Sequence, residues 1–234
     1  MHFQRYAMAL LATVLTGSVA SAQLVPTLQI NCGGQIWNSG APGTMNVTPN
    51  PTGGYNFTGS WSGSLWSGEW SGWFDSDPQV NFAIATTNNS GVTQTFISTL
   101  IVPTALAIPA PSTVFGGTSV TITGNGPATV AAVPGDFVYR ALVGGVPVGA
   151  PLDLLGPPFS LATLTGLPNA TGPINVGPAP GPALAAIDTI GIRHSFSLTA
   201  AGTATGNSAF IIIPAPASML LLVGGALGLT RRRR

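Results

Sequence analysis

Apolar and polar residues alternate along several short stretches of this chain, which is the pattern of β-strands with one face in a core. The clearest example places Val80, Phe82 and Ile84 on one face. An Asn-Asn-Ser-Gly turn follows, and then a second strand-like run that ends before Pro103. Two strand-like runs separated by such a turn predict a β-hairpin over residues 79–102.

Similar alternation predicts further short strands on both sides of this hairpin. They are expected near residues 28–30, 120–122, 137–143, 187–198 and 208–213. In the fourth of these, Ile192, His194 and Phe196 share the apolar face, while Ser195 points the other way. A half-buried histidine with satisfied hydrogen bonds is therefore favoured at position 194 over a general base. Turn-rich alternation without a helical period predicts an all-β protein, an antiparallel β-sandwich or a jelly-roll-like fold, over residues 23–213.

One part of this β-rich body carries many prolines. Residues 147–182 hold nine of them, and proline lacks the amide donor that a central strand needs. We expect long loops or a sheet edge here, with at most short strands near residues 159–164. A boundary between two lobes of the body would also fall in this stretch.

The first residues have the layout of a cleavable signal peptide. Arg5 precedes an apolar run, and Ala20-Ser21-Ala22 fits the small-residue pattern of a cleavage site. The mature protein is then expected to begin at Gln23, with residues 1–22 removed. This layout implies the export machinery and a signal peptidase as partners.

The opposite end has three parts in order. Pro214-Ala215-Pro216 comes first, an uncharged apolar run over residues 217–230 follows, and Arg231, Arg232, Arg233 and Arg234 come last. The apolar run has 14 residues, fewer than the ~20 that a membrane-crossing helix usually needs. Arginine is costly at the bilayer centre, so the basic cluster is expected on the cytoplasmic side, with the body outside.

This three-part arrangement resembles the PEP-CTERM sorting signal of bacterial exported proteins. The resemblance covers residues 214–234, includes Pro214 and Pro216, and pairs with the signal peptide; Ala215 replaces the glutamate of the family motif. It implies recognition by an exosortase-type membrane protease-transpeptidase and delivery to the cell surface or an extracellular polysaccharide matrix. Whether the tail is cut or kept as an inner-membrane anchor stays open.

Charge and cysteine content narrow the choice of partners. Without its two ends the chain keeps two arginines against six carboxylates, a net charge of about −4, and it has no lysine. Nucleic-acid binding, which needs a basic surface, is therefore not expected. Cys32 is the single cysteine, so neither an internal disulfide nor a cysteine-based zinc site is expected.

No established catalytic motif is present, and we expect a protein that is not an enzyme and needs no cofactor. The densest carboxylate group is Glu69, Asp75 and Asp77. Such groups hydrolyse glycosidic bonds or bind Ca²⁺ only if they converge in space. A solvated turn before Pro78 is the favoured interpretation.

A Trp-Ser-Gly repeat is the strongest binding candidate. Trp61, Trp66, Trp70 and Trp73 lie in one segment, as a continuous strand or as two strands joined at a glycine. Tryptophan stacks well on sugar rings, but packing of these side chains inside the sandwich is the favoured interpretation. The sequence therefore predicts an exported surface or matrix protein of structural or interaction type. The alternative is a carbohydrate-binding module that uses the four tryptophans.

Overall fold

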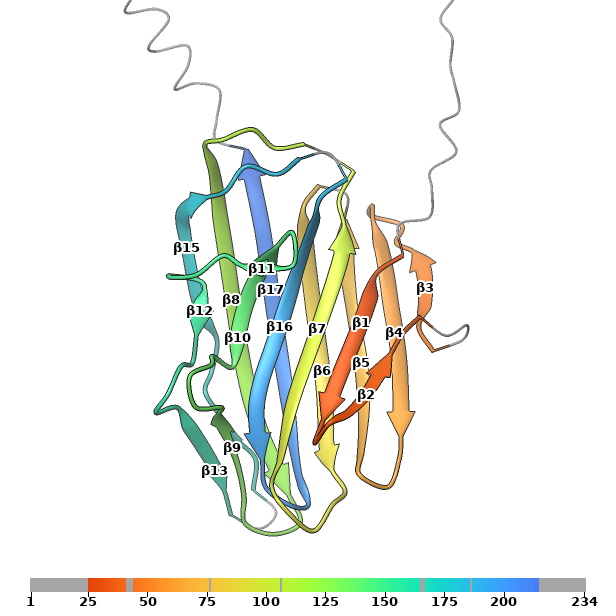
Figure 1. Ribbon diagram of the computed structural model, residues 1–234, viewed down its shortest axis with the longest axis vertical. Helices are drawn as coiled ribbons and strands as arrows, with labels where there is room; N and C mark the ends of the chain where they lie inside the picture. Colours follow the sequence, from red (N-terminus) through yellow and green to blue (C-terminus); the bar gives the residue numbers. More distant parts are fainter. Residues whose placement is uncertain are drawn as a thin grey trace, which may run out of the picture.

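The computed structural model describes residues 25–40, 44–75, 77–105, 107–164, 167–185 and 187–214. These residues form an all-β, sandwich-like fold in which two antiparallel sheets face each other (Figure 1). No helix in these ranges has the length and apolar character needed to span a bilayer. The predicted signal peptide, its cleavage site and the tail after Pro214 lie outside the described residues.

The sheet nearer the viewer in Figure 1, sheet A, has the strand order β11-β10-β16-β7-β1-β2. Two further strands, β12 and β9, pair with β10 and β16, and β13 pairs with β9. The bounds are Thr27–Cys32 for β1, Gln35–Asn38 for β2, Gln94–Pro103 for β7, Ala128–Ala132 for β9, Tyr139–Val143 for β10, Val146–Pro147 for β11, Asp153–Leu154 for β12, Ser160–Thr163 for β13 and Thr189–Leu198 for β16.

Behind it, sheet B has the strand order β14-β8-β17-β6-β5-β4-β3, and β15 also pairs with β8. Its bounds are Asn46–Pro49 for β3, Tyr55–Ser62 for β4, Trp66–Asp75 for β5, Gln79–Asn88 for β6, Ser112–Gly124 for β8, Asn169–Ala170 for β14, Ile174–Gly181 for β15 and Gly202–Pro214 for β17. The late strands β16 and β17 thus lie in the middle of their sheets.

The alternation read from the sequence places the correct residues in the core. Val80, Phe82 and Ile84 of β6 are all buried, and β16 buries Ile192 and Phe196 on its inward face. Inward positions of both sheets contribute to one apolar cluster between them. This is the pattern expected when two half-buried sheets pack face to face.

The predicted hairpin over residues 79–102 is wrong. Both strands exist, but β6 belongs to sheet B and β7 to sheet A, so the turn between them crosses from one sheet to the other. The buried Asn88 side chain fixes this crossing by donating to the carbonyl oxygens of Val92, at 2.8 Å, and Leu198, at 2.9 Å. The connections from β8 to β9 and from β16 to β17 also change sheet.

The proline-rich stretch is partly as expected. Strand β13 lies within the predicted 159–164 region, but the eight-residue β15 was not predicted. Among the strands that the structure describes, this one pairs only with β8, and its register shifts between Val176 and Ala179, around Pro178. Proline is accepted there because one side of an edge strand donates to no neighbour. Strand β17 also begins at Gly202, earlier than the predicted start at Ser208.

Candidate functional site

The Trp-Ser-Gly repeat forms two neighbouring strands of sheet B, as one of the two sequence interpretations required. Strand β4 ends at Ser62 and β5 begins at Trp66, and tryptophans on each strand face glycines on the other. Trp70 lies opposite Gly59, and Trp61 lies opposite Gly68. A Cβ atom at Gly59 would collide with the Trp70 indole, so the glycine makes room for the ring. The repeat therefore reflects cross-strand packing: Trp61, Trp66, Trp70 and the opposing glycines lie on the inward side of the two strands. Trp73 is the exception.

Two of the four predicted glycan-binding tryptophans are in the core. Trp66 and Trp70 have exposed fractions of 2% and 3%, and the Trp70 ring lies 4.5 Å from that of Trp37 on the facing sheet. Their faces are not open to a sugar. A platform made of all four tryptophans is therefore not present, because the side chains of one strand alternate between two faces.

The other two tryptophans reach solvent at separate places. Trp61 is 42% exposed at the end of β4. Trp73 is half-buried and points outward from β5, where its indole Nε1 donates to the carbonyl oxygen of Gly53 at 2.9 Å. This hydrogen bond fixes the orientation of the Trp73 ring on the outer face of sheet B.

The carboxylates singled out in the sequence do not converge. Glu69 and Asp75 lie on the same face of β5 but are six residues apart, which is about 20 Å along a strand. Paired carboxylates of glycosidases are about 5–10 Å apart. Asp77 lies close to Asp75, since its backbone N–H donates to Asp75 Oδ1 at 3.4 Å. Within the described residues, no cluster of acidic, histidine or cysteine side chains has the arrangement of a metal site.

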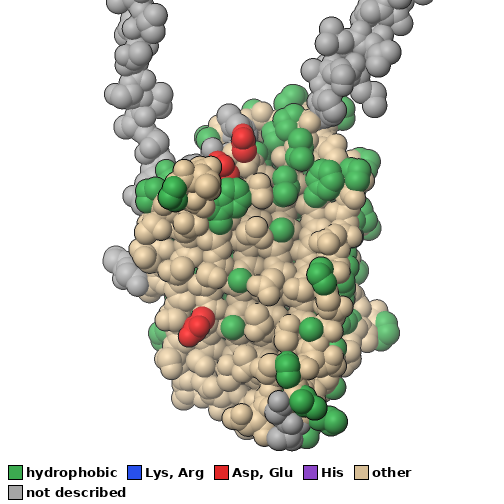
Figure 2. Space-filling view, turned by 180° about the vertical axis from the view of Figure 1, so that it is seen from behind, with side chains coloured by type: hydrophobic (Ala, Val, Ile, Leu, Met, Phe, Trp, Pro, Cys, Tyr) green, Lys and Arg blue, Asp and Glu red, His purple; other side chains and the backbone are tan. Residues whose placement is uncertain are grey.

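The outer face of sheet B, here called the hydroxyl face, carries several serine and threonine side chains in addition to Trp73. Its outward side chains include Thr58, Ser60, Ser71, Thr87, Thr203 and Thr205. Figure 2 shows this face as mostly polar and uncharged, with a few acidic side chains and no basic ones in view. Each hydroxyl both donates and accepts hydrogen bonds, so the face suits a neutral, hydroxyl-rich partner better than an ionic one.

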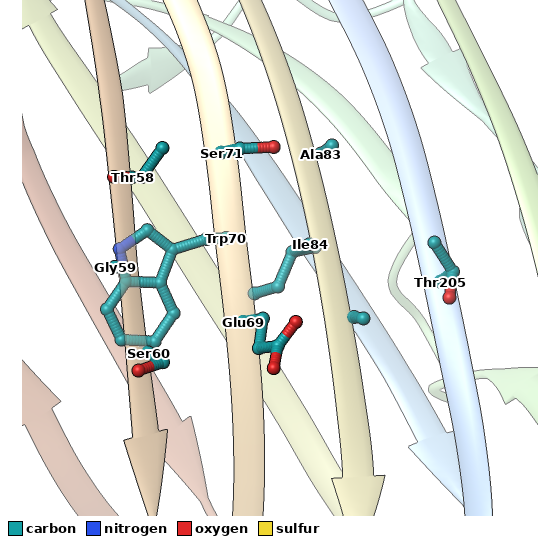
Figure 3. A pocket seen from close by; sticks show the side chains of 10 residues that line it. Thr58, Gly59, Ser60, Glu69, Trp70, Ser71, Ala83, Ile84 and Thr205 are labelled. Atoms are coloured by element: carbon teal, nitrogen blue, oxygen red, sulfur yellow. The ribbon is translucent and has the colours of Figure 1, made fainter.

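A shallow hollow of about 540 Å³ lies in the middle of the hydroxyl face. The small side chains of Ala83 and Ala85 on β6 leave this space open between β5 and β17. Figure 3 shows Ser71 and Glu69 extending from β5 toward β6, with Thr205 on the far margin. The exposed Glu69 carboxylate accepts hydrogen bonds, so the hollow offers both hydroxyl groups and one strong acceptor.

Positive charge in the described residues is confined to sheet A and is ion-paired. Arg140 and Arg193 contact the two carboxylate oxygens of Asp136 at 2.7 and 2.8 Å, and Arg140 lies 3.4 Å from Asp153. Neither guanidinium group is therefore available as an unpaired cation on that side of the molecule.

Several hydrogen-bonded polar side chains lie inside the sandwich, between the two sheets. Of these, the sequence analysis identified only His194. His194 is buried rather than half-buried, with an exposed fraction of 1%. Its Nε2 and the Ser208 Oγ of the facing sheet are 2.7 Å apart, and Ser208 is hydrogen-bonded to Thr118 at 2.8 Å. The Tyr139 hydroxyl donates to the Ala209 carbonyl oxygen at 2.9 Å. These contacts tie the two sheets together.

Burial decides how this interior group titrates. It lowers the pKa of His194 from 6.5 to about 4 and raises that of Tyr139. The imidazole also stacks on Phe82, with ring centroids 5.3 Å apart. The neutral ring is thus enclosed between the two sheets, where it contributes packing and a hydrogen bond. The sequence contained one hint, since Ser98 and Ser208 interrupt otherwise apolar inward positions.

Fold and surface together define an all-β, sandwich-like protein with a nearly uncharged, hydroxyl-rich outer face. No known protein family, curated protein or solved structure matches the chain.

Proposed function

We propose that this chain is an exported bacterial protein of structural or interaction type, located at the cell surface or in an extracellular matrix. In this proposal, residues 1–22 are a cleaved signal helix, residues 23–213 a β-sandwich or jelly-roll-like ectodomain, and residues 214–234 a sorting tail with a short transmembrane helix. The export machinery, signal peptidase and an exosortase-type enzyme are its processing partners.

The path of β17 is the observation that supports this proposal most. This strand lies between β8 and β6 and stays paired up to Pro214, where the proposed tail begins. The last paired residue of β17 is thus the first proline of the motif from which the tail is proposed to start. The sparse charge and hydroxyl-rich surface of the body also suit a protein that lies among neutral polysaccharides.

Mass spectrometry of the protein recovered from its native host tests this proposal. We expect an N-terminus at Gln23, and a C-terminus near Pro216 if the tail is cut or at Arg234 if it is retained. A variant ending at Pro214 keeps all of β17 and should no longer fractionate with the envelope. Full-length protein dissolved in the cytosol, with Met1 still present, would contradict the proposal.

A second candidate function is binding of a neutral polysaccharide by the hydroxyl face. The specific observation is the oriented, half-buried ring of Trp73 on the same face of β5 as Ser71 and Glu69, which line the hollow. An indole face with hydroxyl and carboxylate groups beside it is a suitable surface for a pyranose chain.

Binding to insoluble and soluble glucans, measured by pull-down and calorimetry, tests this second function. Trp73→Ala and Glu69→Gln should each weaken binding by at least about tenfold, equivalent to about 1.4 kcal/mol. Trp61→Ala is the matched control, because it removes an exposed indole from elsewhere on sheet B. Equal effects of Trp61→Ala and Trp73→Ala, or no binding with folding intact, would refute a polysaccharide-binding role for this face.

A further inference from the structure

The folded body has almost no spacer before the proposed transmembrane segment. Ile213 and Pro214 still occupy the β8 ladder, opposite Thr113 and Ser112. The Ile212 backbone N–H also donates to the Pro78 carbonyl oxygen at 2.9 Å, on the other side of the strand. The last residues of β17 are therefore held between two neighbouring segments and move only with the whole sandwich.

Chain length then fixes how far this end of the sandwich lies from a bilayer. Only residues 215 and 216 separate Pro214 from the apolar run that begins at Ala217. Three Cα–Cα steps span at most about 11 Å. The headgroup layer on each side of the hydrocarbon core is itself roughly 5–8 Å thick. If the apolar run is in the bilayer, this end of the body reaches the headgroups.

We propose that the end of the sandwich at Pro214, here called the tail end, is a membrane-contact surface that rests on the interfacial region of the lipid bilayer. The inference rests on the proposed tail anchor and concerns the protein while its tail is intact. It adds a second contact with lipid, made by the folded body itself.

The side chains at the tail end suit this contact. Strand pairing places Val25, Ile187 and Ile213 there, and their exposed fractions are 56%, 88% and 45%. A hollow of about 470 Å³ at the same end is lined largely by apolar residues, including Pro78, Ile108 and Ile213. Figure 2 shows apolar side chains gathered at the upper end of the body, with others along one edge and at the lower end.

Exposure alone would not single out this end, since Val92 is also 62% exposed at the other end of the sandwich. The exit of the chain at Pro214 is what distinguishes the tail end. The length of the apolar run gives a second reason to expect contact between the body and lipid. As a helix, its 14 residues would span about 21 Å of a hydrocarbon core that is ~30 Å thick. Apolar side chains seated in the interface would compensate for part of this difference.

The charges at the tail end indicate which kind of lipid contact to expect. Asp75, Asp77 and Asp188 lie near this end, and neither described arginine does. Contact should therefore depend on apolar burial rather than on attraction to anionic headgroups, and it should persist in phosphatidylcholine and at high salt.

Depth-dependent fluorescence quenching tests the contact. The mature chain, residues 23–234, carrying Ile187→Cys and labelled with bimane, is reconstituted into phosphatidylcholine vesicles with brominated acyl chains. Val92→Cys is the matched control, since it is similarly exposed but lies about 40 Å away along the 13-residue β17. Cys32 is buried, with a pKa raised to about 11, and should stay unlabelled.

We expect bromine to quench most of the fluorescence at position 187 and to leave position 92 unchanged. Equal emission at the two positions, with the protein floating with the vesicles, would overturn the membrane contact while leaving the anchor intact. Failure of the protein to float with the vesicles would overturn the anchor, and the contact with it.

Discussion

Acid should destabilise the fold through His194, whose neutral ring lies between the two sheets. In the folded state burial lowers its pKa to about 4, whereas in the unfolded chain it is expected to keep the ordinary value of 6.5. Between these two pH values the unfolded chain binds a proton that the folded protein does not. Stability from this residue is therefore complete above pH 6.5 and is lost as the pH falls toward 4.

The difference between the two pKa values sets the size of the effect. It corresponds to about 3 kcal/mol of unfolding free energy, since one pKa unit is equivalent to about 1.4 kcal/mol. Total stabilities of about 5–15 kcal/mol are usual, so this loss is a large share. It should appear as a lower urea midpoint without a change in slope.

Urea unfolding followed by tryptophan fluorescence, repeated from pH 7.5 to pH 4.5 in mild detergent, measures this dependence. The control is His194→Gln, which keeps a neutral hydrogen-bonding group near Ser208 but does not titrate. We expect the unfolding free energy of the variant to change much less than that of the parent over this range. If parent and variant lose stability in parallel, the buried histidine is not the cause.

Three further substitutions or reactions test the packing. Gly72→Ala places a Cβ atom against the Asn81 carbonyl oxygen and the Phe57 ring, and it should lower the unfolding free energy by about 1–3 kcal/mol in urea unfolding. The control Gly126→Ala, which has open space around it, should change this free energy little. Tyr139→Phe removes the donor to Ala209 and should cost about 1–3 kcal/mol in the same assay, whereas a neutral result would show that the sheets need no such tie. Cys32 should react with a thiol reagent at pH 8 only after unfolding, and rapid reaction in the native state would contradict its burial.

The sequence predicted which residues enter the core better than it predicted which strands pair. Alternation alone placed Phe82 and His194 on inward faces, because side-chain direction is a local property of a strand. The turn after β6 looked the same as a hairpin turn, yet Asn88 directs it across the core through hydrogen bonds to Val92 and to the distant Leu198. That second partner is 110 residues away in the chain, beyond the reach of any local pattern.

The candidate site was only partly predictable for the same reason. Alternation within a single strand puts Trp73 on the opposite face from Trp66 and Trp70, but the sequence does not show which of these faces is outside. Only the pairing of Gly59 with Trp70 showed that a glycine leaves space for the aromatic ring on the neighbouring strand. The hollow beside Glu69 depends on Ala83 and Ala85 of the adjoining strand, which the sequence gave no reason to associate with that carboxylate.

The position of β16 and β17 in the middle of their sheets bears on how such a chain would cross a membrane. Strand β7 remains without its β16 neighbour, and β6 and β8 remain apart, until almost the whole polypeptide has emerged. Partners this far apart in the chain make assembly slow and dependent on the last segments to arrive. If the chain is exported as proposed, neither sheet can be completed before β16 and β17 have left the translocation pore.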